Sequence, residues 1–223
     1  MRPNGIIIAI DGPTASGKSS TAKTVAKRLG YKHLNTGAMY RAFALYCKQW
    51  GVVDPASDEV GRLLERVYID VDESANVLLE GKDVAAEIVA PDVALLASAL
   101  SSRADVRAKM VEMQQEIGAS GGVVLDGRDI GTVVFPDAEL KIFLIASPKV
   151  RAERRYRELA EKGIAADLVN LETEIAERDR RDSERALSPL RKAPDAVEID
   201  TSTLTFDEQV ERVVELAHAA SSV

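Results

Sequence analysis

The sequence predicts an α/β fold with three layers and a mainly parallel sheet, and three observations lead to this prediction. Short apolar runs, among them Ile6–Ile10, Val123–Asp126 and Leu140–Ile145, have the composition of buried parallel strands. Segments with helical periodicity lie between these runs. A glycine-rich segment, Gly12–Ser19, joins the first strand to the first helix. Alternating strands and helices favour a sheet with helices on both faces.

The composition bounds the class of protein. A chain of 223 residues, with 46% hydrophobic and 29% charged residues, suits one sizeable soluble domain. No apolar run approaches the roughly 18 residues of a membrane span, and no secretory signal opens the chain, so we expect a cytoplasmic protein without membrane contact. The net charge of −7 argues against nucleic acid as a partner. Local basic clusters must therefore hold any anionic ligand.

Cysteine and histidine are too few for a zinc site or a disulfide. The single cysteine, Cys47, lies in a helical pattern, and we expect a buried structural thiol. Two scattered histidines add no zinc ligand set.

The segment Gly12-Pro-Thr-Ala-Ser-Gly-Lys-Ser19 fits G-x-x-x-x-G-K-[ST], the pattern of a phosphate-binding loop. The strand Ile6–Ile10 precedes it, and a helical pattern that ends at Gly30 follows it. A chance glycine turn is the alternative, but the order strand, loop and helix is the one that phosphate binding needs.

The loop predicts the chemistry of one ligand, a nucleotide such as ATP with Mg²⁺. Backbone N–H groups and the helix dipole would converge on its phosphates. Lys18 would reach the β and γ oxygens, and the Ser19 hydroxyl would ligate Mg²⁺. The loop residues expected to contact ATP are Gly12, Pro13, Thr14, Ala15, Ser16, Gly17, Lys18, Ser19 and Ser20.

The next elements interrupt the strand–helix alternation. We expect a strand at Tyr31–Asn35, a helix at Ala38–Trp50 opened by Thr36-Gly37, and a loop and helix within Asp54–Arg66. An antiparallel insertion over about 64–90 follows, with strands Val67–Asp72 and Val77–Glu80, turns Glu73–Asn76 and Gly81–Asp83, and a third strand at Val84–Ile88. Arg41, one turn inside its helix, is either a surface residue or a candidate for binding a second substrate.

A helical pattern from Pro91 to Ile117 leads to the strand Val123–Asp126. An acid at the end of such a strand is the Walker B position, where Asp126 would hold Mg²⁺ directly or through water. Because strand ends face the ligand crevice in open α/β sheets, Arg128 and Asp129 would lie there too. The alternative is an exposed turn.

After Leu140–Ile145, Ser147-Pro148 opens an arginine-rich helix. A loop at Gly163–Asn170 separates it from a second arginine-rich helix, Leu171–Arg185. The pair is either an ordinary charged hairpin or a lid that brings guanidinium groups to transferring phosphates, and the lid fits a phosphate-transfer site better. A strand at Ala196–Asp200 and a helix that begins at the capping box Thr205–Glu208 complete the chain.

Four segments narrow the class: Ile10–Ser19, Asn35–Arg41, Asp126–Pro136 and Arg178–Arg185. On these segments, and over essentially its whole length, the chain resembles the bacterial cytidylate (CMP/dCMP) kinases, which are P-loop nucleoside monophosphate kinases. An Asn-Lys-x-Asp guanine motif, typical of GTPases, is missing from the sequence.

The resemblance implies a P-loop NTPase fold in which a core (about 1–36, 108–149 and 186–223), an NMP-binding region with the β-insertion (about 37–107) and a lid (about 150–185) form one domain. It also implies a monomer that transfers the γ-phosphoryl group of ATP to CMP or dCMP. No general base is needed, because the acceptor phosphate is already ionised near neutral pH.

The resemblance also assigns site residues. Lys18, Arg128, Arg178 and Arg181 would be catalytic, and Arg154 and Arg155 would assist at ATP. The residues implied at CMP are Thr36, Arg41, Ser98, Arg107, Arg128, Asp129, Arg178, Asp182 and Arg185, with Ser98, Arg107 and Arg185 at the base and Asp182 at the ribose. Ser19 and Asp126 would hold the metal.

Two alternatives stay open. The acceptor of a P-loop kinase can be another nucleoside monophosphate or shikimate, and a regulatory module can bind ATP without turnover.

Overall fold

The computed structural model describes residues 2–72, 74–161 and 163–222. Glu73 of the predicted turn Glu73–Asn76, Lys162 of the predicted lid, and Met1 and Val223 at the limits of the predicted core lie outside the described residues. The elements follow the order β1 (Ile7–Asp11), α1 (Lys18–Leu29), β2 (Lys32–Asn35), α2 (Thr36–Gln49), α3 (Glu59–Leu64), β3 (Ile69–Val71), β4 (Val77–Leu79), β5 (Lys82–Asp83), α4 (Pro91–Leu100), α5 (Ala104–Gly118), β6 (Val123–Gly127), the π-helical turn η1 (Ile130–Val134), β7 (Leu140–Ile145), α6 (Pro148–Glu161), α7 (Leu168–Glu184), β8 (Val197–Asp200) and α8 (Phe206–Ser221).

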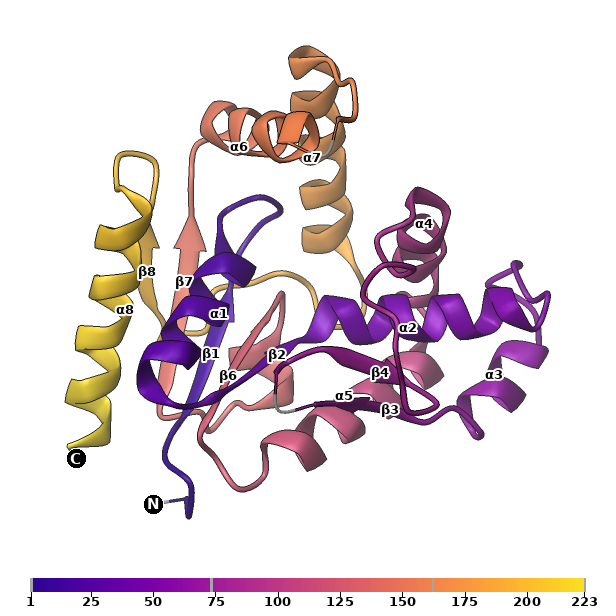
Figure 1. Cartoon of the computed structure of the whole chain (residues 1–223), viewed down its shortest axis with the longest axis horizontal. Coiled ribbons are helices and arrows are strands. Elements are labelled where there is room, and N and C mark those ends of the chain that lie inside the picture. Colours follow the sequence, from indigo (N-terminus) through magenta and orange to yellow (C-terminus); the bar gives the residue numbers. More distant parts are fainter. Residues whose placement is uncertain (1, 73, 162, 223) are drawn as a thin grey trace.

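The central sheet has the strand order β2-β6-β1-β7-β8, and every neighbouring pair is parallel (Figure 1). The first strand is the middle strand, so the loop that follows it emerges at the centre of one sheet edge. The prediction of a mainly parallel sheet is confirmed.

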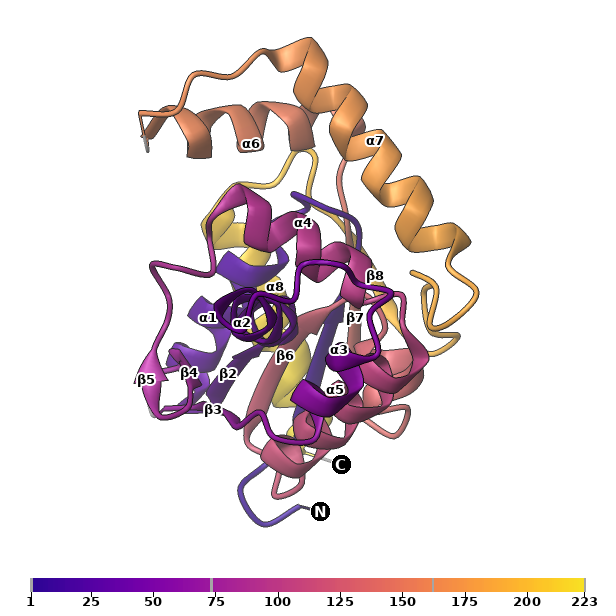
Figure 2. The ribbon, with the colours of Figure 1, turned by 90° about the vertical axis from the view of Figure 1, so that its right-hand side faces the viewer.

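From Ile6 through β1, successive side chains point alternately to the two faces of the sheet, and each face packs on its own hydrophobic core. Ile6, Ile8 and Ile10 pack with α1 and α8 on one face. Ile7 and Ala9 pack with α2, α4 and α5 on the other face. The helices therefore cover both faces and produce three layers, as Figures 1 and 2 show from two directions.

The β-insertion packs on α2 and consists of the antiparallel strands β3, β4 and β5. The insertion is confirmed, but the predicted third strand at Val84–Ile88 is wrong, because the third strand is β5 within the predicted turn. The N–H groups of Glu87 and Ile88 bond back to the carbonyl oxygen of Val84 (3.1 and 3.0 Å). Val84 and Ile88 are both buried at a spacing of four, which is a helical period.

Two helix boundaries also differ from the predictions. The pattern from Pro91 to Ile117 is broken at Arg103, whose backbone is extended and whose Nη1 donates to the carbonyl oxygens of Pro55 and Ser57. The predicted loop Gly163–Asn170 is too long, since the Asp167 side chain caps α7 by accepting from the Asn170 N–H group (2.9 Å).

The arginine-rich helices α6 and α7 form a hairpin above the sheet edge at which the strands β1, β6 and β7 end (Figure 2). Cys47 is buried in α2, as expected. In the part of the chain that the structure describes, no helix has both the length and the apolar character to cross a bilayer.

Asp11 links the end of β1 to η1. Its carboxylate accepts hydrogen bonds from the N–H groups of Ile130 (2.9 Å) and Gly131 (2.8 Å). The side chain is buried, and this burial raises the pKa of Asp11 to about 6 in spite of the two hydrogen bonds. The folded protein therefore keeps a proton on Asp11 at pH values at which the unfolded chain has lost it.

Removing the titration of Asp11 should change how stability depends on pH. Because the unfolded chain ionises first, the stability of the wild type relative to Asp11→Asn should fall as the pH rises from about 4 to about 6. The rise of the Asp11 pKa from 3.8 to about 6 corresponds to a fall of up to about 3 kcal/mol. Urea denaturation of both proteins at stepped pH measures this difference. A difference that stays constant, or that grows with pH, would contradict the raised pKa.

Gly12 stands where β1 passes close to β7. It has a φ of +149°, and a Cβ atom there would lie 2.1 Å from the carbonyl oxygen of Leu144. Gly30 is a matched control, because its φ of +69° also disfavours a side chain, but a Cβ atom added there would meet no tertiary neighbour within 4 Å. We expect Gly30→Ala to lower the free energy of unfolding by about 1 kcal/mol and Gly12→Ala by about 3 kcal/mol or more. Urea denaturation measures both, and equal losses would argue against the close approach.

Candidate active site

The glycine-rich loop Gly12–Ser19 curls around the N-terminus of α1. Ala15 and Gly17 have φ values of +59° and +92°, and Gly17 is the N-cap of α1. The Lys18 ammonium lies back against the loop, donating to the carbonyl oxygen of Pro13 (2.5 Å) and to Ser16 Oγ (3.3 Å). Burial, followed by the charge of Arg128, holds the pKa of Lys18 well below its ordinary value. An anion beside Lys18 would relieve both effects.

Ser19, at the start of α1, lies against Asp126, near the end of β6. The Ser19 hydroxyl donates to Asp126 Oδ2 (2.5 Å), while His33 Nε2 on β2 lies 2.7 Å from Asp126 Oδ1. Asn35 Nδ2 also donates to Ser19 Oγ (3.2 Å). One hydroxyl and one carboxylate are hard oxygen ligands of the kind that Mg²⁺ accepts together with phosphate oxygens and water. Among the described residues, no group of three or more His, Cys, Asp and Glu side chains forms a fuller metal site.

Arg128, one residue beyond β6, connects the glycine-rich loop to α7. Its Nη2 donates to Thr14 Oγ1 (2.9 Å) and its Nε donates to Asp182 Oδ2 (2.8 Å). Burial raises the pKa of Asp182, but the charges of Arg128, Arg185 and Arg178 outweigh burial and lower it. Asp182 is therefore an ionised carboxylate held among guanidinium groups.

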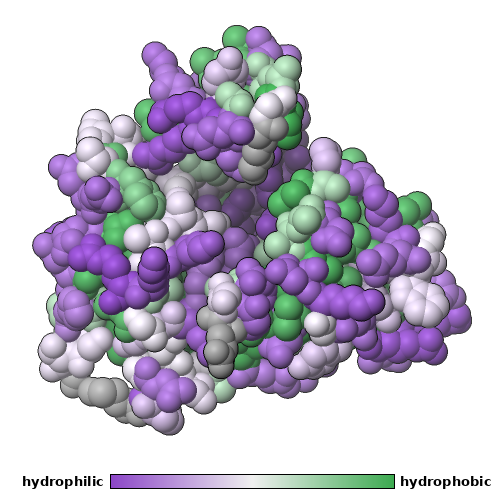
Figure 3. Space-filling model, viewed as in Figure 1, coloured by the Kyte–Doolittle hydropathy of each residue, from purple (hydrophilic) through white to green (hydrophobic). Residues whose placement is uncertain are grey.

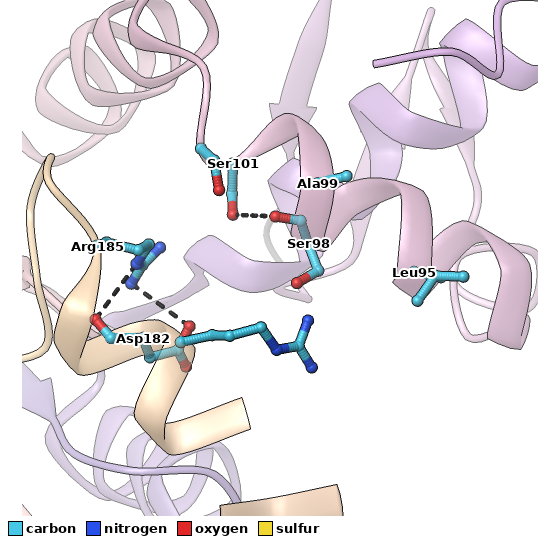
Figure 4. A pocket seen from close by; sticks show the side chains of 8 residues that line it. Leu95, Ser98, Ala99, Ser101, Asp182 and Arg185 are labelled. Carbon is cyan, nitrogen blue, oxygen red and sulfur yellow. Dashed lines mark hydrogen bonds and ion pairs between the residues drawn. The ribbon is translucent and has the colours of Figure 1, made fainter. Parts of the chain in front are cut away.

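A pocket opens between α4 and the C-terminal end of α7 (Figure 4). Ser98 on α4 faces Asp182 and Arg185 across it, and Arg185 bonds back to Asp182 through Nε (3.4 Å, to the carbonyl oxygen). Arg181 also lines the pocket. The structure thus brings these four predicted residues together.

A second cluster of polar side chains lies where α5 packs beside the segment that follows β6. Arg107 pairs with Asp129 through Nη2 and donates to the carbonyl oxygen of Ser101 through Nη1 (3.2 Å). The Arg107 Cζ atom lies 5.9 Å from the centre of the Tyr40 ring, and Arg107 Nε is buried with no partner among the described residues. Burial raises the pKa of Tyr40 to about 12, so this phenol stays neutral. Arg107 Nε is thus a buried donor that no described residue satisfies.

Four further predicted arginines are Arg41, Arg154, Arg155 and Arg178, and they differ in burial and in their contacts. Burial lowers the pKa of Arg41 on α2, and desolvation followed by the charge of Arg128 lowers the pKa of Arg178 to about 10. Both keep their charge at neutral pH. Arg154 donates to the carbonyl oxygen of Ser16 (3.2 Å) and to Thr201, whereas Arg155 pairs with Glu158 on the hairpin surface. The described contacts of Arg155 do not include the glycine-rich loop, although its charge acts on Arg178.

Thr36, the first residue of α2, connects this helix to the central sheet. Its hydroxyl donates to the carbonyl oxygen of Asp126 (2.8 Å), which ties the start of α2 to the end of β6. The Asn35 side chain caps α2 by accepting from the Ala38 N–H group (2.8 Å).

Several polar residues of the site were not predicted from the sequence: His33, Tyr40, and the pair Arg151 and Asp179, which bond to the backbone of Thr14 in the glycine-rich loop. His33 and Tyr40 belong to ordinary strand and helix patterns, and only the packing of β2 on β6 and of α2 on α5 reveals their partners. Arg151 and Asp179 stand among the many charges of the hairpin, where spacing alone does not separate inward from outward side chains.

The site as a whole is a hydrophilic hollow beneath the hairpin (Figure 3). Arg128, which donates to Thr14 Oγ1, lies beside the glycine-rich loop, and the charges of Arg128 and Arg178 both act on Lys18. Through Asp182, Arg128 also joins this group to the α4–α7 pocket. One continuous set of cations and N–H donors thus runs from the glycine-rich loop to the α4–α7 pocket. Such an arrangement suits two phosphate-bearing ligands placed end to end.

Comparisons with known proteins agree with this geometry. A family model described as Cytidylate kinase matches residues 8–219. A cytidylate kinase from Pelodictyon phaeoclathratiforme is 51% identical over 221 residues, which cover 96% of this chain and 95% of the relative. A cytidylate kinase from Geobacter sp. (strain M21) is 48% identical over 214 residues, 95% of this chain and 92% of the relative.

Among solved structures, the shikimate kinase from Acinetobacter baumannii in complex with shikimate aligns with a TM-score of 0.50. The alignment covers 97% of this chain and 95% of that chain at 14% sequence identity, so it shows a shared fold alone. The family model and the two curated relatives, by contrast, span nearly the whole chain, and the relatives are 48% and 51% identical to it. This chain belongs to the cytidylate kinase family.

Proposed function

We propose that this protein transfers the γ-phosphoryl group of ATP to CMP or dCMP, with Mg²⁺ bound to ATP. The observation that carries the proposal is the position of Arg128, which joins the phosphate-binding loop Gly12–Ser19, through Thr14, to Asp182 of the α4–α7 pocket. Membership of the cytidylate kinase family supports cytidine as the acceptor nucleoside.

The chemistry needs alignment and charge neutralisation rather than a base. A phosphate oxygen of CMP, already ionised near neutral pH, attacks the γ-phosphorus of ATP. The bond between this phosphorus and the β–γ bridging oxygen breaks, its electrons stay on that oxygen, and the products are ADP and CDP. Lys18 holds the β and γ oxygens, while Arg128, Arg178 and Arg181 balance the charge on the transferring group. Mg²⁺, held by Ser19 and Asp126, supplies further neutralisation when bound.

The acceptor residues divide by their place in the structure. Arg41, Arg128 and Arg178 serve the CMP phosphate, and Asp182, facing the pocket, accepts a hydrogen bond from a ribose hydroxyl. The base lies toward Ser98, Arg107 and Arg185, with Thr36 and Asp129 supporting the same pocket. The unpaired Nε donor of Arg107 supports this assignment, since an acceptor group of the base would satisfy a donor that has no partner among the described residues.

The remaining assignments complete the proposal. Gly12–Ser20 and Arg154 contact ATP, and Arg155, whose charge acts on Arg178, assists at the same site. The chain works as a cytoplasmic monomer with a core, an NMP-binding region (about 37–107) and a lid (about 150–185). Closure of the lid over both nucleotides would exclude water as a competing acceptor.

The test is ADP release in a coupled assay with ATP, Mg²⁺ and CMP, dCMP, UMP, AMP or shikimate as the acceptor. We expect CMP and dCMP to give kcat/KM values at least about tenfold above those of the other acceptors. The variant Lys18→Ala is the control for contaminating kinases, and its rate should fall by about a thousandfold or more. A preference for a non-cytidine acceptor, or ATP binding without turnover on any acceptor, would overturn the proposal.

A further inference from the structure

Side chains from both helices of the hairpin hold the backbone of Thr14 in the phosphate-binding loop. The Thr14 N–H group donates to Oδ1 of Asp179 on α7 (2.9 Å), and the Thr14 carbonyl oxygen accepts from Nη1 of Arg151 on α6 (3.0 Å). Nη1 of Arg151 also pairs with Oδ2 of Asp179. These contacts close a ring of Thr14, Arg151 and Asp179, which we name the clasp.

The clasp is anchored in the packed part of the hairpin. Arg151 Nε donates to the carbonyl oxygen of Ala146, directly after β7, so its guanidinium is fixed by the strand from which the hairpin starts (3.1 Å). Asp179 continues, at intervals of four residues, the face of α7 on which Leu171 and Ile175 are buried. Only 8% of the Arg151 side chain and 17% of the Asp179 side chain are exposed. Because the ion pair is largely buried, its contribution to stability depends strongly on the geometry of its hydrogen bonds.

The same helix carries groups of the proposed acceptor site. Arg178 precedes Asp179 in the chain, and Asp182 follows it by about one turn. Asp182 accepts from Arg128 Nε, and Arg128 Nη2 donates to Thr14 Oγ1. Thr14 is therefore joined to α7 twice, through its backbone by the clasp and through its side chain by Arg128.

We propose that Arg151 and Asp179 are positioning residues that set the place of α7 relative to the phosphate-binding loop. The clasp keeps the arginines of α7 in register with the γ-phosphoryl group that the loop holds. This inference rests on the proposed function. Arg151 and Asp179 do not line the α4–α7 pocket, so their effect on the reaction passes through Thr14 and α7.

The test compares Asp179→Asn, Arg151→Lys and the double variant with the wild type. Each single change keeps the size or the charge of the side chain but breaks the ring. We expect kcat with CMP to fall about tenfold or more in each single variant, while the Kd of ATP, measured by calorimetry, changes less than about threefold. The double variant should be hardly worse than either single variant, because both residues act through one ring. Amide hydrogen exchange at Thr14 without nucleotide should become faster in all three variants.

The matched control is Glu184→Gln, which breaks the ion pair with Arg180 on the same helix. Both of those side chains are largely exposed (65% for Arg180 and 62% for Glu184), so this variant should keep the kinetics and the Thr14 exchange of the wild type. A wild-type kcat in the folded Asp179 and Arg151 variants would overturn the positioning role. A raised rate with tighter ATP binding would overturn it too. In that case Asp179 would act as an inhibitor, because it occupies the Thr14 N–H group that would otherwise donate to a phosphate oxygen. If the wild type lacks activity on CMP, the proposed function fails, and Thr14 exchange still reports separately on the clasp.

Discussion

The contact of Arg128 with both the phosphate-binding loop and α7 is the interaction on which the site depends. Arg128 follows β6, the strand that pairs with β1, so the parallel register of two buried strands delivers it beside the loop. Its hydrogen bonds to Thr14 and Asp182 then bring the hairpin onto the sheet edge. The core positions the strands, the strands position Arg128, and Arg128 with the clasp positions the arginines of α7.

The site concentrates positive charge in a chain whose net charge is −7. Several of these cations are desolvated, and the pKa values of Lys18, Arg41 and Arg178 are lowered for that reason first. Buried cations that repel one another are costly unless anions accompany them. Asp126 and Asp182 provide part of the balance, and the phosphates of two nucleotides supply more. The electrostatic demand of the site and the proposed reaction therefore point to the same ligands.

Much of this arrangement could be predicted from the sequence, because the signals were local. The loop Gly12–Ser19 identifies itself by spacing, and the buried strands identify themselves by apolar runs. The prediction of the third strand of the insertion at Val84–Ile88 is wrong, because a short apolar run fits a helical turn as well as a strand. Val84 and Ile88 form such a turn in the structure. The roles of His33, Tyr40 and Asp179 depend on contacts across elements, such as β2 with β6 or α7 with the loop, and no local pattern encodes such contacts. The different contacts of Arg154, which bonds to Ser16, and of Arg155, which pairs with Glu158, likewise depend on side-chain directions that the sequence does not specify.

The central claim is that one crevice holds a donor and an acceptor nucleotide with their phosphates end to end. Its most direct measurement is calorimetric titration with an analogue in which five phosphates join adenosine to cytidine. Because such an analogue reaches both halves at once, we expect it to bind one to one, with a Kd at least about a hundredfold below that of ATP, and to be displaced by ATP and by CMP. Affinity no higher than that of ATP, or displacement by only one of the two nucleotides, would contradict the account.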